Sequence, residues 1–505
     1  MAETPKKLYD YDMTTWLRCC ETEVEKPLEG KITGTVPSWL SGTLIRNGPG
    51  TIKIGSTEYS HVFDGSALLH RFAIKNGIVT YQCRFLNTET LKKNKKANRI
   101  VITEFGTTSV PDPCHTIFDR ISSIFDPMSF ITDNAGVSVY PFGDQVYAMT
   151  EVPTVFKIDP ESLETLERKS LINKLVVIHT AHPHIMPNGD MYNIGVQLVR
   201  GRLKHVIVRF PYTVKGDMFD AAEVVTAVEP RWHFSPTYMH SFGITENYFV
   251  IIEQPFALST LNIVRNIVIN KPFSSTLAWY PEYETQILLV NRRTGEEKRY
   301  RTDTFFFMHV VNSYEISGKL IIDVCAYKDA KIIDAMYVDA IKNKERYPDY
   351  KQWNQCRPKR YEIPLDAPSH TKIDALLLAD IGIEAPRINY DLYNGKPYRY
   401  FYGIGAGIGS EYARSIIKVD ILTGDLKTWR EPDGNPSEPI FVPTPDSKDE
   451  DDGVLLSAIL WSDKDNAVSL VILNARDLQE ISRADFTTPS QVPNCFHGWY
   501  FPDSM

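Results

Sequence analysis

The sequence has few cysteines, no long apolar run and no excess of positive charge. Its 505 residues include seven cysteines, an odd number, and no two have the Cys-x-x-Cys spacing, so no disulfide framework is expected. No apolar run approaches the roughly 18 residues that span a bilayer, and the N-terminus lacks the apolar core of a signal peptide. The net charge of −8 argues against a nucleic-acid partner, which normally requires a basic face. These absences predict a cytoplasmic protein with reduced thiols.

A recurring turn is the most regular feature of the chain. Each copy has an apolar, β-rich run, then Asp or Asn, a short turn and a charged run. The four copies centre on Asp159, Asn291, Asp420 and Asn474. Asp and Asn stabilise turns through their own side chains, so each copy is typical of a hairpin with one buried and one solvated strand.

The spacing of these hairpins indicates the architecture. The last two copies are 54 residues apart, close to one propeller blade of about 50 residues, and the longer gaps contain further hairpin signals. We therefore predict an all-β fold, with residues 1–505 forming one β-propeller of about six to eight blades and long loops on one face. The alternative is two β-sandwiches in tandem, although no Pro/Gly/Ser-rich linker divides the chain.

Four histidines in strand-like contexts are the best candidates for a functional site. They are His182, His240, His309 and His497. Their gaps of 58, 69 and 188 residues fit no local zinc motif, but the inner strands of a propeller share one axis and could bring the four rings together. Neutral imidazoles suit Zn, Cu, Fe and Ni. The sequence thus predicts either one metal on the axis or four unrelated core histidines.

Three glutamates could assist such a metal. Glu151 follows a strand, and Glu384 and Glu438 lie among proline and apolar neighbours, where a free carboxylate is unusual. A metal without carboxylate or thiolate ligands needs negative charge close behind its histidines, and such groups also orient the rings. A surface loop beside proline is the alternative for each glutamate.

Seven motifs together resemble the carotenoid cleavage oxygenase family. In order they are Phe63–His70 (FDGSALLH), Arg99–Gly106 (RIVITEFG), Thr180–His184 (TAHPH), Tyr192–Gly195 (YNIG), His240–Gly243 (HSFG), Pro436–Val442 (PSEPIFV) and Phe496–Gly498 (FHG). The match runs from about residue 25 to the C-terminus. It is most similar to the animal branch, which holds carotenoid oxygenases, the insect carotenoid isomerooxygenase and the retinoid isomerase of the pigment epithelium.

This resemblance implies a seven-bladed β-propeller, covered on one face by a helical and loop dome, with one Fe(II) per chain. Motif by motif, the implied iron ligands are His182, His240, His309 and His497. The implied supporting glutamates, serving three of the four ligands, are Glu151, Glu384 and Glu438. The family's ligand in TAHPH is the first histidine, so His184 is not included. No catalytic side chain is implied beyond the metal site.

The implied activity is a dioxygenase that uses O2 to split a carotenoid double bond into two carbonyl products. Central 15,15′ cleavage to apocarotenal or retinal is expected, with or without coupled trans-to-cis isomerisation. A retinyl-ester isomerohydrolase on the same fold is one alternative. Tyr327 stands where a tryptophan is expected in the vertebrate retinoid isomerase, which favours carotenoid cleavage. A non-catalytic propeller scaffold is the other alternative, and it would need no inward ring of histidines.

A polyene requires a tunnel lined by aromatic and aliphatic side chains. The candidates near the ligand motifs are Phe105, Thr150, Tyr238, Phe307 and Tyr327. Strand alternation places Phe307 on the face of His309 and Tyr238 on the face of His240. Packing in the core is the alternative for each.

Two amphipathic segments, near 112–130 and 256–273, fit peripheral insertion into a membrane surface, from which a carotenoid or retinoid must be taken. By pattern alone they fit helices packed on the propeller equally well. Cys114 is a candidate for an acyl chain. The sequence leaves the oligomeric state open.

Overall fold

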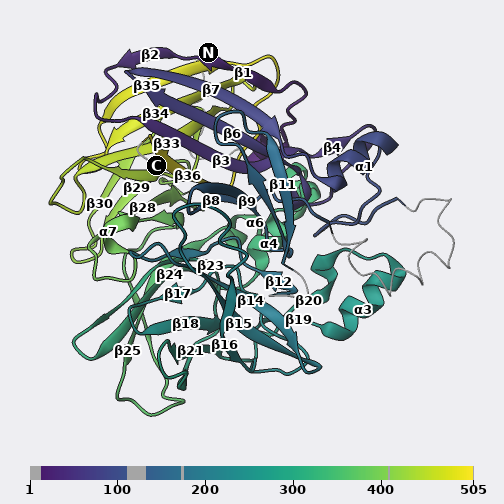
Figure 1. Cartoon of the computed structure of the whole chain (residues 1–505), viewed down its shortest axis with the longest axis vertical. Helices are drawn as coiled ribbons and strands as arrows, with labels where there is room; N and C mark the ends of the chain where they lie inside the picture. Colours follow the sequence, from purple (N-terminus) through teal and green to yellow (C-terminus); the bar gives the residue numbers. More distant parts are fainter. Residues whose placement is uncertain (1–12, 111–131, 172–175, 408–409, 504–505) are drawn as a thin grey trace.

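The fold is known from a computed structural model that describes residues 13–110, 132–171, 176–407 and 410–503. Seven antiparallel sheets of four to six strands are arranged as the blades of a β-propeller (Figure 1). We number them 1 to 7 in the order in which most of their strands occur along the chain. The predicted all-β propeller and the implied number of seven blades are confirmed, and the tandem β-sandwiches are excluded.

The two ends of the chain close the ring through blades 1 and 7. Blade 1 has the order β1 (Val24–Glu29), β7 (Ile78–Phe85), β6 (Ser66–Lys75), β3 (Gly42–Thr51) and β36 (His497–Pro502). Blade 7 has the order β2 (Lys31–Gly34), β35 (Glu480–Thr487), β34 (Ala467–Asn474), β33 (Gly453–Trp461) and β31 (Gly434–Pro436), and β32 (Ile440–Pro443) also pairs with β33. An N-terminal strand therefore completes blade 7, and the C-terminal strand completes blade 1.

Blades 2 to 6 follow one another along the chain. Blade 2 is β8 (Ser138–Phe142), β9 (Gln145–Met149), β10 (Thr154–Ile158) and β11 (Thr165–Ser170); blade 3 is β12 (Ile178–His179), β14 (Met191–Val199), β15 (Arg202–Phe210) and β16 (Glu223–Val228), with β13 (His184–Ile185) paired to β14. Blade 4 is β17 (Gly243–Ile244), β18 (Tyr248–Glu253), β21 (Thr285–Asn291) and β22 (Glu297–Thr302). Blade 5 is β23 (Phe306–Ile316), β24 (Lys319–Tyr327), β25 (Cys356–Pro364) and β26 (Ala375–Leu377); blade 6 is β27 (Ile383–Arg387), β28 (Tyr400–Gly405), β29 (Ile416–Asp420) and β30 (Leu426–Trp429).

The four turns singled out in the sequence join β10 to β11 in blade 2, β21 to β22 in blade 4, β29 to β30 in blade 6 and β34 to β35 in blade 7. Asp159 Oδ1 accepts hydrogen bonds from the backbone N–H groups of Glu161 and Ser162, at 3.0 and 2.7 Å. Asn291, Asp420 and Asn474 accept the equivalent bond two residues further on, at 3.0, 3.0 and 2.8 Å. The predicted hairpins are confirmed, and their side chains stabilise the turns as expected.

Burial explains why the middle strands lack a polar–apolar alternation. Blades pack face to face, so both faces of a middle strand are covered. Eight of the nine residues of β33 are buried, and so are eight of nine in β24. The outer strand β11 is largely exposed and is correspondingly charged.

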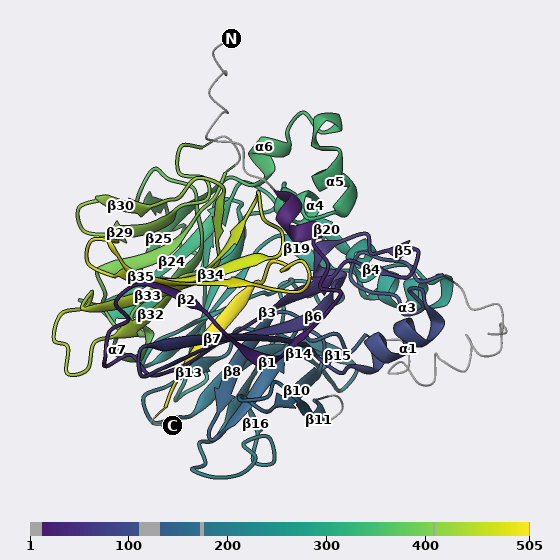
Figure 2. The same cartoon turned by 90° about the horizontal axis from the view of Figure 1, so that it is seen from above.

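Most of the helices and the short ribbons lie on one side of the propeller, whereas α7 (Tyr390–Tyr393) lies on the opposite side (Figure 1). The helices and 3₁₀ turns are η1 (Met13–Leu17), η2 (Val62–Asp64), α1 (Glu89–Ala97), α3 (Thr260–Ile269), η4 (Phe273–Thr276), α4 (Lys331–Ala335), α5 (Val338–Lys342), η5 (Lys344–Arg346), α6 (Tyr350–Trp353) and α7 (Tyr390–Tyr393). The two-stranded ribbons are β4 (Lys53–Ile54) with β5 (Thr57–Glu58), and β19 (Phe256–Leu258) with β20 (Leu277–Trp279). Figure 2 shows α4, α5 and α6 gathered outside the sheets, near η1. Within the described residues, no helix has the length and apolar character needed to cross a bilayer.

Candidate metal centre

Four blades each bring one histidine to the same point. His182 lies between β12 and β13, His240 lies three residues before β17, His309 lies within β23, and His497 begins β36. One ring nitrogen from each of the four lies within 4.8 Å of the others. These blades are 3, 4, 5 and 1, so residues spread over more than 300 positions meet in one cluster.

The spacing of the Nε2 atoms fits one metal ion. The distance is 3.0 Å between His182 and His240, 3.3 Å between His240 and His309, and 3.3 Å between His309 and His497. Nitrogen ligands about 2.1 Å from a metal lie about 3.0 Å apart when adjacent in an octahedron and about 3.4 Å apart in a tetrahedron. The cluster therefore has the dimensions of a four-nitrogen coordination sphere.

Three of the four imidazoles are held from behind by carboxylates. Nδ1 of His240 lies 2.6 Å from Glu151, and Nδ1 of His309 lies 2.6 Å from Glu384. Nδ1 of His497 lies 2.9 Å from Glu438. Each carboxylate accepts a hydrogen bond from the Nδ1–H group of its histidine, which leaves the Nε2 lone pair free and directed at the centre.

His182 differs from the other three because, among the described residues, no carboxylate contacts its ring. Burial first, and then the neighbouring imidazoles, hold the pKa of His182 well below its usual value. Burial also lowers the pKa of His497 to about 4, although Glu438 opposes the shift. Both rings are therefore neutral near pH 7, the state that binds metals.

The three carboxylates have different partners of their own. The Tyr238 hydroxyl donates to both oxygens of Glu151, at 2.8 and 2.9 Å. Burial, reinforced by Glu151, raises the pKa of Tyr238 well above its usual value, so the hydroxyl keeps its proton. Glu384 accepts a hydrogen bond from the backbone N–H of Ala385, at 2.5 Å.

Glu438 is surrounded by positive charge instead. Arg387 Nε donates to Oε1 of Glu438 at 2.8 Å, and a guanidinium nitrogen of Arg46 lies 3.9 Å from Oε2. The backbone N–H of Gly498 donates to Oε2 at 3.1 Å. Burial opposes ionisation, but Arg387 and then His497 lower the pKa of Glu438 below its ordinary value.

The two arginines were not predicted from the sequence. Arg46 is fully buried in β3 and donates to the carbonyl oxygens of Glu438 and Phe496, at 3.0 and 3.2 Å, and to Sγ of Cys495 at 2.9 Å. A single cation in the otherwise uncharged strand Gly42–Thr51 was the available signal, because buried arginine requires partners.

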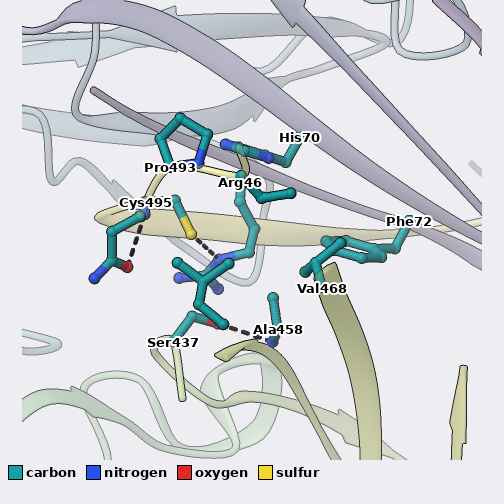
Figure 3. A pocket seen from close by; sticks show the side chains of 11 residues that line it. Arg46, His70, Phe72, Ser437, Ala458, Val468, Pro493 and Cys495 are labelled. Atoms are coloured by element: carbon teal, nitrogen blue, oxygen red, sulfur yellow. Dashed lines mark hydrogen bonds between the residues drawn. The ribbon is translucent and has the colours of Figure 1, made fainter. Parts of the chain in front are cut away.

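A small cavity between blades 1 and 7 is lined in part by Arg46. Figure 3 shows Arg46 directed at Cys495, with His70 and Phe72 on the adjacent wall. Its volume of about 10 Å³ holds about one water molecule and is far too small for a polyene.

The tunnel candidates fall into two groups. Tyr238 and Tyr327 are buried in one aromatic-rich cluster beneath α4 to α6, and Phe105 packs against it. Phe105 also contacts Phe63 at 5.4 Å between ring centroids, and Phe63 contacts Phe496, the neighbour of His497, at 5.6 Å. Thr150 is buried beside Glu151. Aromatic rings thus extend from the histidine cluster to the covering helices.

Phe307 lies outside this aromatic cluster, and the prediction that it shares the face of His309 is wrong. It packs in the core between blades 4 and 5, with Val250 and Val324. The pairing of β23 with β24 is irregular between Phe307 and Val310, so alternation does not hold across His309. Phe306 takes its place in the aromatic cluster with Tyr238 and Tyr327.

His184 is outside the cluster, as the motif implied. Its Nδ1 lies 3.0 Å from the Tyr390 hydroxyl and its Nε2 lies 2.8 Å from the carbonyl oxygen of Phe242. It therefore connects blade 3 to blade 4 and α7. Cys114 and the whole segment 112–130 lie outside the described residues.

Comparison with known proteins identifies relatives of the whole chain. Residues 17–502 match the family described as retinal pigment epithelial membrane protein. A carotenoid isomerooxygenase of Galleria mellonella is 56% identical, covering 99% of each chain, and a β,β-carotene 15,15′-dioxygenase of Mus musculus is 37% identical, covering 95% of this chain and 90% of the relative. The solved structure of a cobalt-substituted ACO from Synechocystis has a TM-score of 0.79 at 25% identity, covering 97% of this chain and 98% of the other.

Proposed function

Because this chain belongs to the carotenoid oxygenase family, we propose that it is a non-haem Fe(II) dioxygenase that cleaves a carotenoid double bond. The decisive observation is the convergence of four Nε2 atoms within 4.8 Å. Three of the rings donate Nδ1–H hydrogen bonds to glutamates, so their Nε2 lone pairs converge on the centre and repel one another unless a cation lies between them. A scaffold protein has no need of such an arrangement.

The residues of the chain fit iron in particular. Four imidazoles without a carboxylate or thiolate leave room on a six-coordinate metal, whereas zinc normally closes at four ligands or uses three and water. When bound, Fe(II) supplies the activation of O2, and one O2 with one double bond gives two carbonyl groups. We assign iron to His182, His240, His309 and His497.

The protein side chains bind and orient the substrate, and no proton transfer is required of them. The aromatic cluster with Tyr238, Tyr327 and Phe306 offers an apolar wall for a polyene and excludes water. Which double bond reaches the metal is set by how far the polyene can enter, so the wall determines the site of cleavage.

We propose central 15,15′ cleavage with coupled trans-to-cis isomerisation as the reaction. Two relatives support both halves of this proposal: the Galleria protein is named a carotenoid isomerooxygenase, and the Mus protein is named a 15,15′-dioxygenase. We propose that residues 1–505 form a single propeller domain.

Product analysis tests this function. Protein loaded with Fe(II) is incubated under air with β-carotene and with zeaxanthin in detergent, and the products are separated by liquid chromatography with mass detection. Retinal-sized aldehydes are expected, and part of them should be an 11-cis isomer. Larger apocarotenals would overturn central cleavage. Intact carotenoid, with iron shown to be bound, would overturn the dioxygenase and point to a retinyl-ester isomerohydrolase.

We also propose that the protein takes its substrate from a membrane surface through α3 and its neighbours. Leu261 in α3 is 80% exposed, Phe234 is 75% exposed, and Ile269 is 45% exposed. The carbonyl oxygen of Phe234 accepts hydrogen bonds from Thr260, so Phe234 and the start of α3 are adjacent. Helix α3 contains one charged residue, Arg265, and lies at the periphery of the molecule (Figure 1). These features are typical of a helix in the membrane interface.

Replacing Leu261 by aspartate is expected to lower binding to phosphatidylcholine vesicles about tenfold or more. Burying a leucine side chain in an apolar phase stabilises by about 1.5–3 kcal/mol, and about 1.4 kcal/mol corresponds to a factor of ten. Flotation on a density gradient measures the bound fraction. Leu422→Asp is the matched control, because Leu422 is 70% exposed in a turn of blade 6. Equal flotation of both variants and the unaltered protein would contradict the proposed membrane surface.

A further inference from the structure

The three carboxylates behind the histidines differ in the positive charge that surrounds them. Within the described part of the chain, neither Glu151 nor Glu384 forms an ion pair with a lysine or arginine. Glu438 pairs with Arg387 at 2.8 Å and lies 3.9 Å from Arg46. The negative charge behind His497 is therefore offset, whereas the charges behind His240 and His309 are not.

Arg387 is placed to hold both members of the Glu438–His497 pair. Its Nε donates to Glu438, and its Nη2 donates to the carbonyl oxygen of Gly498 at 3.0 Å. Gly498 directly follows His497 on the closing strand β36. Arg387 itself belongs to β27 of blade 6, and its guanidinium lies 6.0 Å from the ring of Trp499. One side chain therefore joins blade 6, the Glu438 loop of blade 7 and the strand that supplies the histidine.

We propose that Arg387 is a positioning residue of the metal centre, which fixes Glu438 against His497 and offsets the charge of that carboxylate. This inference rests on the proposed function, because it requires iron at the four histidines. A guanidinium donates from a planar fork, so it can bind Glu438 and Gly498 at once, which a lysine ammonium cannot do with the same geometry.

Two consequences distinguish positioning from mere packing. Loss of the fork frees Glu438 and the ring of His497, and changes of this kind behind a metal ligand typically weaken metal binding about 10- to 100-fold. Loss of the positive charge leaves the site more negative, which stabilises Fe(III) relative to Fe(II) and lowers the midpoint potential. Arg387→Lys removes the fork alone, and Arg387→Gln removes both fork and charge.

The test compares Fe(II) affinity, by competition with a chelator, and the Fe(III)/Fe(II) midpoint potential. Arg387→Lys should bind Fe(II) about tenfold more weakly at nearly the original potential. Arg387→Gln should also bind more weakly, at a clearly lower potential. Should Arg387→Gln fail to fold, the affinity of Arg387→Lys decides the matter.

Arg360→Gln is the matched control. Arg360 donates two hydrogen bonds to the buried carboxylate of Asp323, at 2.9 and 2.8 Å, and Asp323 contacts Tyr398 rather than a histidine of the cluster. It should lose stability without changing affinity or potential. The proposal is overturned if folded Arg387 variants keep the original affinity and potential. Failure of the unaltered protein to bind iron would instead overturn the proposed function.

Discussion

Replacing His240 by alanine is expected to reduce the iron content from one ion per chain to below about one tenth and to abolish carotenoid cleavage. His240 supplies one of the four Nε2 atoms of the cluster, 3.0 Å from that of His182 and 3.3 Å from that of His309. Its loss also leaves Glu151 without the imidazole that it holds. Metal analysis of the purified protein measures the iron, and chromatography measures the aldehydes.

His233 provides the control for this substitution. It lies seven residues earlier, and its side chain is 61% exposed. His233→Ala should keep both iron and cleavage. Full iron occupancy in His240→Ala would show that His240 is not a ligand, and the four-histidine assignment would be wrong.

Glu438→Gln is expected to cost about 3–5 kcal/mol of folding free energy and to weaken iron binding as well. Glu438 is 2% exposed, and it compensates Arg387 directly and Arg46 at longer range. A neutral glutamine leaves the fully buried guanidinium of Arg46 and the partly buried guanidinium of Arg387 without a counter-charge. Urea unfolding of the metal-free protein measures the stability separately from the iron.

Glu151→Gln is the comparison that isolates the effect of the arginines. Glu151 also holds a histidine of the cluster, but its side chain is 22% exposed and its other partner is the neutral Tyr238. Its replacement should weaken iron binding about 10- to 100-fold and cost only about 1–2 kcal/mol of stability. Equal destabilisation by the two substitutions would contradict the role given to the buried charges around Glu438.

Much of the fold could be predicted from local sequence because turn chemistry is local. Asp159 and Asn291 act within three residues of their own position, so the pattern and the structure agree. The number of blades could not be counted this way, since the spacing of the turns allowed six to eight, and the value of seven came from the family resemblance. The family itself is confirmed by the match over residues 17–502.

The histidines and glutamates of the site could be predicted from the sequence, but the arginines that contact Glu438 could not. His182 and His497 are separated by most of the chain, and sequence spacing alone left both a metal ring and unrelated core histidines open. The structure brings all four together. Arg387 and Arg46 depend on contacts between blades 1, 6 and 7, which no local pattern encodes. Phe307 was misplaced because the irregular pairing within β23 breaks strand alternation.

Crystals of the protein prepared with Fe(II) without oxygen, measured on both sides of the iron absorption edge, test the central claim most directly. The expected result is one anomalous peak, about 2.1 Å from the Nε2 atoms of His182, His240, His309 and His497. A protein that contains iron, but whose anomalous peak lies away from these four nitrogens, would contradict the assignment of this site.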